Sequence, residues 1–155
     1  MEPFLQILIF QLDEQKFAIS LSSVKRILRA VEVTPVPKAP LIIHGVIDLG
    51  GEIIPVINLR RRLAYPEQPV HPDNRFILAR NSRRTIVLVA DEVQGIEHAR
   101  EGDFIKADHI VKGMEIEGVV KRKDGVILIY DIDKFLPIEE EKILNEALNK
   151  QKQGK

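Results

Sequence analysis

Two stretches of the chain share one pattern: GVIDLGGEIIPVINLRRRL at residues 45–63 and GVVKRKDGVILIYDIDKFL at residues 118–136. When the two stretches are aligned from their first residues, the apolar positions recur in the same order, and Asn58 falls on Asp131. In each stretch, two apolar runs flank a glycine-containing turn, which predicts a β-hairpin. The sequence therefore contains a duplicated β unit.

The repeat extends upstream of these hairpins, where residues 17–27 lie on residues 86–96. This second alignment is shifted slightly relative to the first, as one loop of unequal length would produce. We therefore predict two related β units in one compact, all-β protein with short helices, and we expect function in the groove between them. The upstream pairs used below are Val24 with Val93 and Ile27 with Ile96.

Length and composition predict a small cytoplasmic protein. A chain of 155 residues suits one compact domain or two very small subdomains, and it can bury a core without a metal or a disulfide. The absence of cysteine fits a reducing compartment. Residues 1–3 lack the positive charge of a signal peptide, and no apolar run approaches the roughly 20 residues that span a membrane. We expect no direct membrane insertion.

Charge and aromatic content argue against nucleic-acid binding. Lys+Arg and Asp+Glu number 23 each, so the formal net charge is +0, whereas a nucleic-acid binder usually has a strongly basic face. Two local basic clusters, residues 60–62 and 83–84, have acidic neighbours. Because the chain has no Trp and few other aromatic residues, base stacking is poorly supported.

Short apolar runs bounded by turn residues predict the strands. Pro55 lies inside one of them and indicates an edge strand or a bulge, because proline donates no ladder hydrogen bond. The proline-rich residues 34–40 predict a stiff loop, and residues 64–74 predict the linker between the halves. Residues 101–113 predict an irregular loop with one short turn. The predicted strands are residues 4–12, 16–21, 24–33, 42–49, 53–57, 75–79, 85–90, 93–97, 118–121 and 126–130.

A change of pattern at residue 138 predicts a separate C-terminal element. An apolar stripe at helical spacing follows three acidic residues and precedes lysines, an order that complements the helix dipole. We divide the chain into a β domain over residues 1–137, in which strands could be exchanged between the two units, and an amphipathic helix with a frayed tail over residues 138–155. The stripe consists of Ile143, Leu144, Ala147 and Leu148.

No constellation of residues predicts catalysis, a metal site or a cofactor. The paired carboxylates Asp91-Glu92 and Asp131 with Asp133 could suggest acid–base or metal chemistry. They follow strands at equivalent positions of the repeat, however, where short acceptor side chains bond local backbone N–H groups. We interpret them as structural turns and predict that the protein is not an enzyme. The histidines match no zinc pattern and lie at His44, His71, His98 and His109.

Six blocks in order resemble the CheW-like family, the coupling proteins of bacterial chemotaxis and the related domain of the CheA kinase. The most specific block, GVIDLGGEIIPVINLR at residues 45–60, is close to the family pattern GVINLRGxIIPVIDLR. The resemblance covers about Phe4 to Leu136. It implies two five-stranded SH3-like barrels packed around a shared hydrophobic interface, in agreement with the repeat. The other blocks are residues 9–19, 24–27, 34–40, 89–93 and 128–136.

The resemblance also implies partners and binding residues. Members of this family are non-enzymatic adaptors that hold a CheA-type histidine kinase, through its regulatory domain, against the cytoplasmic tip of transmembrane chemoreceptors. The receptor tip is a helical rod that could lay apolar side chains into a groove between two barrels. The positions that match the family's receptor groove are Val24, Ile27 and Val93, each of which also reads as an ordinary core residue.

Three further positions are candidates for a partner interface: Arg26, Gly45 and Gly50. Backbone geometry alone would explain Gly45. Arg26 stands where the family usually carries Glu, and Gly50 stands where it usually carries Arg. Because these changes alter electrostatic complementarity, we hypothesise a divergent receptor–kinase pair or a signalling system other than flagellar chemotaxis. The alternative is a surface that has drifted without consequence.

Two other classes of function compete with the adaptor. Small SH3-like barrels elsewhere bind RNA, which makes a nucleic-acid-binding module one alternative. The other is a small-molecule sensor that uses the groove between the barrels as its pocket. Strong, salt-sensitive retention on heparin would favour the first alternative, and thermal stabilisation by a metabolite would favour the second.

Overall fold

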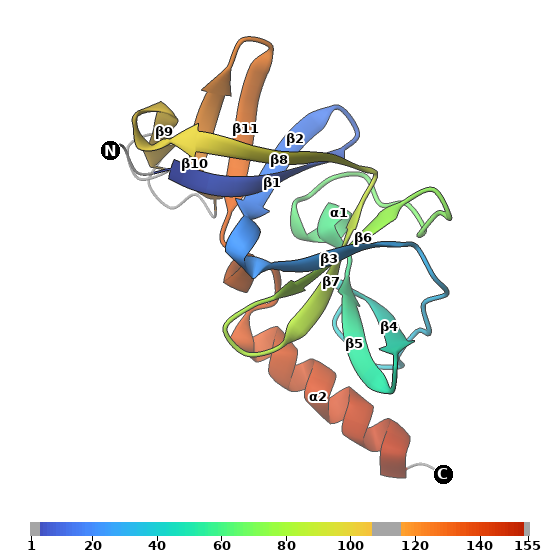
Figure 1. Ribbon diagram of the computed structural model, residues 1–155. Coiled ribbons are helices and arrows are strands. Elements are labelled where there is room, and N and C mark those ends of the chain that lie inside the picture. The colour runs from blue at the N-terminus through green and yellow to red at the C-terminus, as the bar shows by residue number, and fades with distance from the viewer. Residues whose placement is uncertain (1–3, 107–115, 154–155) are drawn as a thin grey trace.

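The computed structural model describes residues 4–106 and 116–153, which form two β-sheets and a C-terminal helix (Figure 1). Each sheet curves into an SH3-like barrel. The first barrel contains six described strands, one more than expected, and the extra strand has three residues. In sheet order its strands are β8 (Glu92–Arg100), β1 (Phe4–Leu12), β2 (Gln15–Ser20), β11 (Gly125–Tyr130), β10 (Ile116–Arg122) and β9 (Phe104–Lys106).

The second barrel contains the expected five strands. Two short helical segments follow the two repeated hairpins, α1 (Leu59–Arg62) after β5 and the 3-10 helix η4 (Ile132–Phe135) after β11. The described residues also include the 3-10 turns η1 (Leu21–Ser23) and η2 (Glu101–Asp103). In sheet order the strands of the second barrel are β3 (Val24–Arg29), β6 (Arg75–Arg80), β7 (Thr85–Ala90), β5 (Glu52–Ile57) and β4 (Ile43–Leu49).

The structure confirms the sequence repeat. The series β4, β5 and α1 corresponds element for element to the series β10, β11 and η4. Both hairpins also shift register at the same place, after Ile43 in the first hairpin and after Ile116 in the second. Asn58 and Asp131 both cap the helical turn that follows, since their side chains accept hydrogen bonds from the backbone N–H groups of Arg61 and Asp133.

Each barrel takes strands from both repeats. The first barrel contains β1 and β2 from the first repeat and β8 to β11 from the second, whereas the second barrel contains β3 to β5 and then β6 and β7. The chain therefore crosses between the barrels at η1 and again at Asp91. Residues 64–74 join α1 to β6, so they connect the two repeats while both of their ends lie in the second barrel.

Three apolar clusters stabilise this arrangement, one inside each barrel and the largest between them. We call the largest cluster the shared core. Phe10 and Phe17 from the first barrel stack there with ring centroids 5.9 Å apart. Ile77 and Leu88 from the second barrel are fully buried in the same cluster. Burying each such side chain contributes about 1.5–3 kcal/mol, so the two barrels fold as one unit.

Two strand predictions are wrong in detail. β3 ends at Arg29, before the predicted end at Val33, because its partner strand β6 begins at Arg75, directly opposite Arg29. Of the two alternatives for Pro55, the edge strand is wrong, since β5 lies between β7 and β4. The register irregularity of this hairpin does lie beside Pro55, opposite Val56 and Ile57. The pairing of β5 with β7 begins only after Pro55. Pro55 therefore makes no pair with β7 that would need the backbone N–H that proline lacks.

The predicted loop at residues 101–113 contains the expected short turn, η2, and also a short strand, β9, which was not expected. Residues 107–113 lie outside the described part of the chain. The C-terminal helix begins where predicted and is α2 (Ile138–Gln153). Among the described helices, none has both the length and the apolar composition needed to span a bilayer.

Helix α2 packs against the second barrel and extends beyond it (Figure 1). Leu144 is fully buried in the shared core, and Ala147 is buried beside it. The turn between β6 and β7 contributes polar contacts. Arg83 donates to the carboxylate of Glu141, and Arg84 donates to the side-chain oxygen of Asn145.

Candidate functional site

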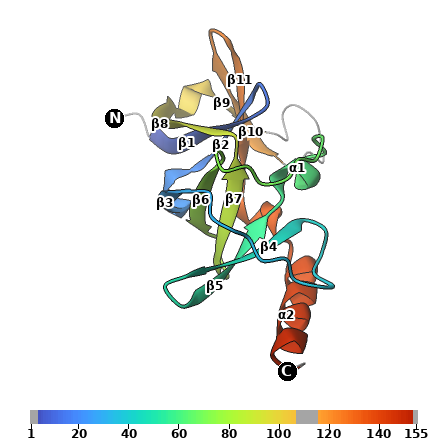
Figure 2. The ribbon, with the colours of Figure 1, turned by 90° about the vertical axis from the view of Figure 1, so that its right-hand side faces the viewer.

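The strands that carry the predicted receptor-binding residues, β3 and β8, are the edge strands of the two barrels. They occupy equivalent places in the repeat, and each pairs with the first strand of the other repeat. Both lie on the side of the molecule that faces the viewer in Figure 1, which becomes the left margin when the molecule is turned (Figure 2). One face of the protein therefore presents an edge from each barrel.

Equivalent β-bulges change the direction in which side chains point on β3 and β8. In β3 the register steps from Val24 opposite Ala79 to Arg26 opposite Leu78, so Lys25 is the extra residue. In β8 the corresponding extra residue is Gln94, between Val93 and Gly95. A bulge inserts one residue and shifts the alternation of faces. Residues three apart thus come to lie on the same face of the strand.

As a result, Val24 and Ile27 both point toward the shared core, since they lie opposite Ala79 and Ile77, which belong to it. Val93 and Ile96 do the same from β8, opposite Phe10 and Leu8. Val24 and Val93 are half-buried, whereas Ile27 is 37% exposed and Ile96 is 56% exposed. We call these four residues the rim surface: Val24, Ile27, Val93 and Ile96.

The prediction from sequence named three of the rim residues and missed Ile96. The repeat already paired Ile27 with Ile96, and this pairing was the signal that could have identified it. Ile27 and Ile96 are exposed apolar side chains at equivalent places on the two barrels. They form an open apolar surface at the edge of the shared core.

The three other predicted interface residues lie apart from the rim surface, all on the second barrel. Arg26 is exposed on the opposite face of β3, across from Leu78 of the barrel interior. Gly50 lies in the turn between β4 and β5 with φ of 62°, and a Cβ there would meet no atom within 4 Å.

Gly45 has a structural reason to be glycine. A Cβ at this position would lie 2.2 Å from the carbonyl oxygen of Thr34, and its φ is 154°. Thr34 and Val46 exchange two backbone hydrogen bonds of 2.9 Å at this point. The equivalent Gly118 is also tightly enclosed, since a Cβ there would lie 2.4 Å from the ring of Phe104.

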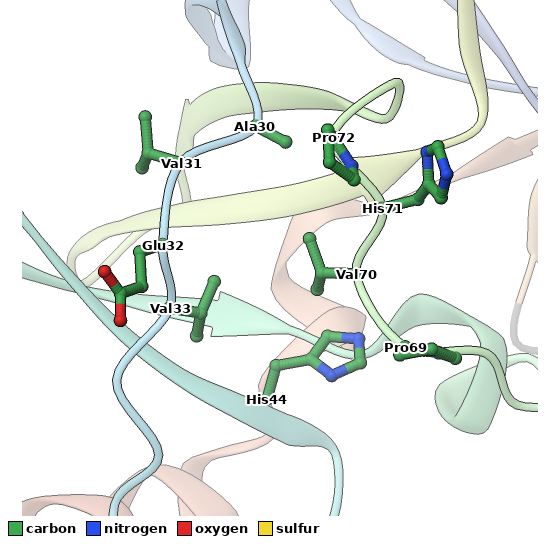
Figure 3. A pocket seen from close by; sticks show the side chains of 9 residues that line it. All are labelled: Ala30, Val31, Glu32, Val33, His44, Pro69, Val70, His71 and Pro72. Carbon is green, nitrogen blue, oxygen red and sulfur yellow. The ribbon is translucent and has the colours of Figure 1, made fainter.

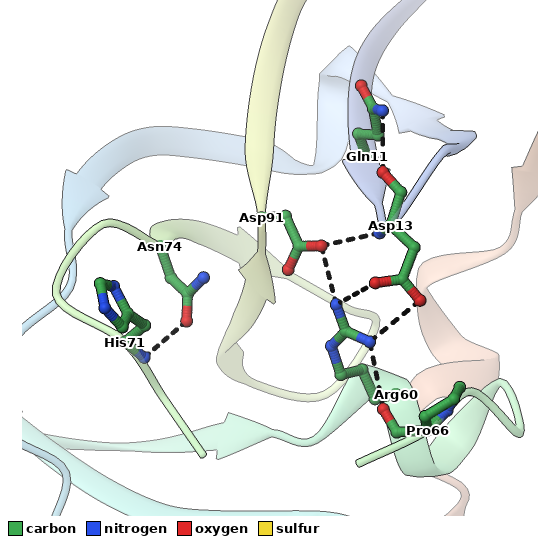
Figure 4. Close-up of polar contacts among 7 residues, drawn as sticks. All are labelled: Gln11, Asp13, Arg60, Pro66, His71, Asn74 and Asp91. Carbon is green, nitrogen blue, oxygen red and sulfur yellow. Dashed lines mark hydrogen bonds and ion pairs between the residues drawn. The ribbon is translucent and has the colours of Figure 1, made fainter. Parts of the chain in front are cut away.

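An ion-pair network connects the two barrels (Figure 4). Arg60 follows β5 in the second barrel, and its side chain is only 8% exposed. It donates to both carboxylate oxygens of Asp13, in the β1–β2 turn, at 3.2 and 2.8 Å. It also donates to Asp91 at 2.8 Å and to the carbonyl oxygen of Pro66 at 3.1 Å. Four segments of chain thus meet at one guanidinium.

This network corrects the interpretation of Asp91. Its carboxylate accepts from the backbone N–H of Asp13 at 2.7 Å and from Arg60, and not from a local turn. Arg60 lowers the pKa of Asp13, chiefly through their side-chain hydrogen bond, and the same bond raises the pKa of Arg60. No local sequence signal identified this cluster, because its members are far apart in the chain.

A cleft of about 470 Å³ lies on the surface of the second barrel, between two of its loops (Figure 3). It separates residues 30–33 from residues 69–72, and His44 lies between them. Burial lowers the pKa of His44, and the carboxylate of Glu67 opposes this effect. No rim residue lines the cleft, so it offers no support for a small-molecule pocket in the groove between the barrels.

The remaining described histidines are spread over the molecule. His71 is exposed in the segment that joins the repeats, and His98 lies on β8 beside Gln6. His109 is outside the described residues. Among the residues that the structure describes, no three His, Asp or Glu side chains are grouped for a metal ion.

The fold and the site thus define a class: a two-barrel protein in which one edge strand of each barrel presents exposed apolar side chains at equivalent positions. The family model described as CheW-like domain matches residues 6–140. A solved structure described as the scaffolding protein TtCheW from Thermoanaerobacter tengcongensis aligns with a TM-score of 0.79 and 25% identity, covering 90% of this chain and 96% of that one.

Curated relatives agree with this match. The chemotaxis protein CheW of Thermotoga maritima is 31% identical over 134 residues, which covers 84% of this chain and 87% of that protein. The chemotaxis protein CheW of Bacillus subtilis is 29% identical with 84% and 86% coverage. Protein FrzA of Myxococcus xanthus is 29% identical over 96 residues, 62% of this chain and 60% of its own. The chain belongs to the CheW-like family of chemotaxis scaffold proteins.

Proposed function

We propose that this protein is a non-enzymatic adaptor that connects the cytoplasmic tip of a chemoreceptor to the regulatory domain of a CheA-type histidine kinase, at receptor arrays on the cytoplasmic face of the membrane. Membership of the CheW-like family over residues 6–140 supports the scaffold role. The single observation that carries the proposal is the rim surface, since two barrel edges there present apolar side chains at equivalent positions.

The rim surface suits a helical receptor segment. Amphipathic helices bind by laying side chains at i, i+3, i+4 and i+7 against an apolar surface. Ile27 and Ile96 are exposed enough to contact such side chains, while Val24 and Val93 connect the surface to the shared core. A helix bound here would contact both barrels at once, so receptor binding would depend on how the barrels are placed relative to each other.

The kinase would bind at the ends of the barrels. Ile53 on β5 and Val126 on β11 occupy equivalent places in the two repeated hairpins and are 46% and 45% exposed. The family resemblance implies that the kinase's own related domain docks on such hairpin ends. Gly50 lies in the turn of the hairpin that carries Ile53, which keeps it in the candidate kinase interface. Gly45 is buried beneath Thr34 at the other end of this hairpin, where a structural role explains it.

Arg26 and Gly50 depart from the charges usual at their positions, and one relative is named protein FrzA. Both observations support a role for this protein with a divergent receptor and kinase, or in a pathway other than flagellar chemotaxis. The exposure of Arg26 on the far face of β3 favours a contact beside the rim surface, not within it.

The proposal is tested by measuring the binding of the full chain to two purified partners from its source organism. One is the cytoplasmic hairpin fragment of a chemoreceptor, and the other is the regulatory domain of the kinase. We expect saturable binding to both, with simultaneous occupancy. Absence of binding to either partner, together with strong salt-sensitive retention on heparin, would support the nucleic-acid alternative instead.

A further inference from the structure

Two arginines face each other at the end of the rim surface. Arg29 is the last residue of β3, and it lies directly opposite Arg75, the first residue of β6. Both side chains are exposed. They lie on the same face as Val24 and Ile27, because Arg29 is two positions after Ile27 along a regular strand, where side chains alternate between faces. The apolar surface of the second barrel therefore continues directly into a pair of guanidinium groups.

This pair is unfavourable as it stands. Side chains directly opposite on antiparallel strands have Cβ atoms roughly 4.5–5.5 Å apart, and like charges there destabilise the sheet. Within residues 4–106 and 116–153, neither Arg29 nor Arg75 forms an ion pair or a side-chain hydrogen bond. The repulsion is thus not offset by any acid that the structure describes.

The equivalent position in the first barrel has different residues, and these form a hydrogen bond. In the repeat, Arg29 corresponds to His98 on β8 and Arg75 corresponds to Gln6 on β1. These two residues also lie opposite each other, but their side chains hydrogen-bond at 3.0 Å. One end of the rim surface is therefore closed by an internal hydrogen bond, while the other end presents two cations.

We infer that Arg29 and Arg75 together bind a carboxylate of the receptor helix that covers Ile27. This inference rests on the proposed function and adds to it a chemical requirement for the receptor. Arg29 lies two strand residues beyond Ile27, a distance of roughly 6.8 Å. In a receptor helix that runs along β3, four residues rise about 6 Å. The receptor segment must therefore carry Glu or Asp three or four positions from the apolar side chain that contacts Ile27. Both guanidinium groups would donate to this one carboxylate.

The test measures the affinity of the full chain for the cytoplasmic hairpin fragment of a chemoreceptor from its source organism, at 50 and 200 mM salt as assay conditions. Arg29→Gln and Arg75→Gln should each weaken binding about fivefold to tenfold at the lower salt, and the double variant should lose most of the salt dependence. Arg80→Gln is the matched control. Arg80 is an exposed arginine on the same strand as Arg75, on the face that includes Phe76 and Leu78 of the barrel interior. It should bind within about twofold of wild type.

Two further measurements make the inference specific. Removing either guanidinium should leave the melting temperature unchanged or raise it, because a repulsion is relieved. When the acidic residues of the receptor fragment are changed to Lys one at a time, one of these changes should restore binding of the fragment to the Arg29→Glu variant. If Arg29→Gln and Arg75→Gln bind as wild type at both salt concentrations while Ile27→Arg abolishes binding, the carboxylate inference is wrong and the proposed function stands. If wild type binds no receptor fragment, the proposed function itself is contradicted.

Discussion

Arg60 of the second barrel holds Asp13 of the first through two hydrogen bonds, with Nη2 2.8 Å from Oδ1 and Nη1 3.2 Å from Oδ2. Bidentate pairs of this kind add geometric specificity as well as energy. The rim surface draws one strand from each barrel. Its shape therefore depends on the relative placement of the barrels, which this ion pair and the shared core determine together.

Replacement of Arg60 should loosen this connection. We expect Arg60→Met to lower the free energy of unfolding by about 1–3 kcal/mol, because hydrogen bonds to charged groups are lost and the apolar stem is kept. Arg61→Met is the matched control, since Arg61 is exposed and pairs only with exposed Glu67 among the described acids; it should cost less than about 1 kcal/mol. Urea unfolding measures both. Equal losses would contradict a special role for Arg60.

The same ion pair predicts a pH dependence. Arg60 holds the pKa of Asp13 below its ordinary value of 3.8. Above that value Asp13 is ionised in both the folded and the unfolded chain, so its contribution is fully present. As the pH falls from about 4 through the lowered pKa, the unfolded chain takes up the proton first and the contribution is lost. The stability difference between wild type and Asp13→Asn should thus be constant from about pH 5 to 7 and shrink on acidification. A constant difference down to about pH 2.5 would contradict this account.

Gly45 should resist substitution for steric reasons. Gly45→Ala places a methyl group 2.2 Å from the carbonyl oxygen of Thr34, and we expect a loss of about 2 kcal/mol or more in the free energy of unfolding. Gly102→Ala is the control, because a Cβ there meets no atom within 4 Å. Chemical denaturation of both variants checks this. If Gly45→Ala were as stable as wild type yet failed to bind the kinase domain, Gly45 would belong to an interface and not to the fold.

Much of the fold could be predicted from the sequence because it is encoded locally. Glycine-containing turns and apolar runs indicated the two repeated hairpins, and acidic residues before an apolar stripe indicated where α2 begins. The local hydrogen bond of Asp131 was predicted for the same reason, since its side chain satisfies a backbone group within its own turn.

The parts that escaped prediction depend on contacts between distant residues. The carboxylate partners of Arg60, Asp13 and Asp91, are 47 and 31 residues away in the sequence, so no local pattern predicts these contacts. The bulge at Lys25 contains no glycine or proline, although it decides which side chains of β3 reach the rim surface. The bulge at Gln94 is followed by Gly95, with φ of 130°, a signal that the prediction did not use. The end of β3 is set by where β6 begins, which is a property of the partner strand.

The docking of α2 gives a matched pair of variants on neighbouring residues. Leu144 is fully buried in the shared core, whereas Ile143 is 47% exposed. Leu144→Ala should lower the free energy of unfolding by about 2–5 kcal/mol, and Ile143→Ala should change it by less than about 1 kcal/mol. Thermal unfolding distinguishes them. Similar small effects from both would mean that α2 is not anchored in the shared core.

The rim surface predicts a symmetry in receptor binding. Ile27→Arg and Ile96→Arg should each weaken binding of the receptor hairpin fragment at least about tenfold without unfolding the protein, because both side chains are exposed. Val126→Arg, which changes an equally exposed residue on a hairpin end, should leave this affinity unchanged. Titration calorimetry provides the comparison. Loss of binding from Ile27→Arg alone would restrict the receptor site to the second barrel.

The most direct measurement of the central claim is a bridging assay with receptor fragments displayed on lipid vesicles and purified kinase. Co-sedimentation of the kinase should rise with added wild-type protein, and it should stay at background when Ile27→Arg/Ile96→Arg replaces wild type. Kinase recruitment that is the same with and without this protein would contradict the adaptor account.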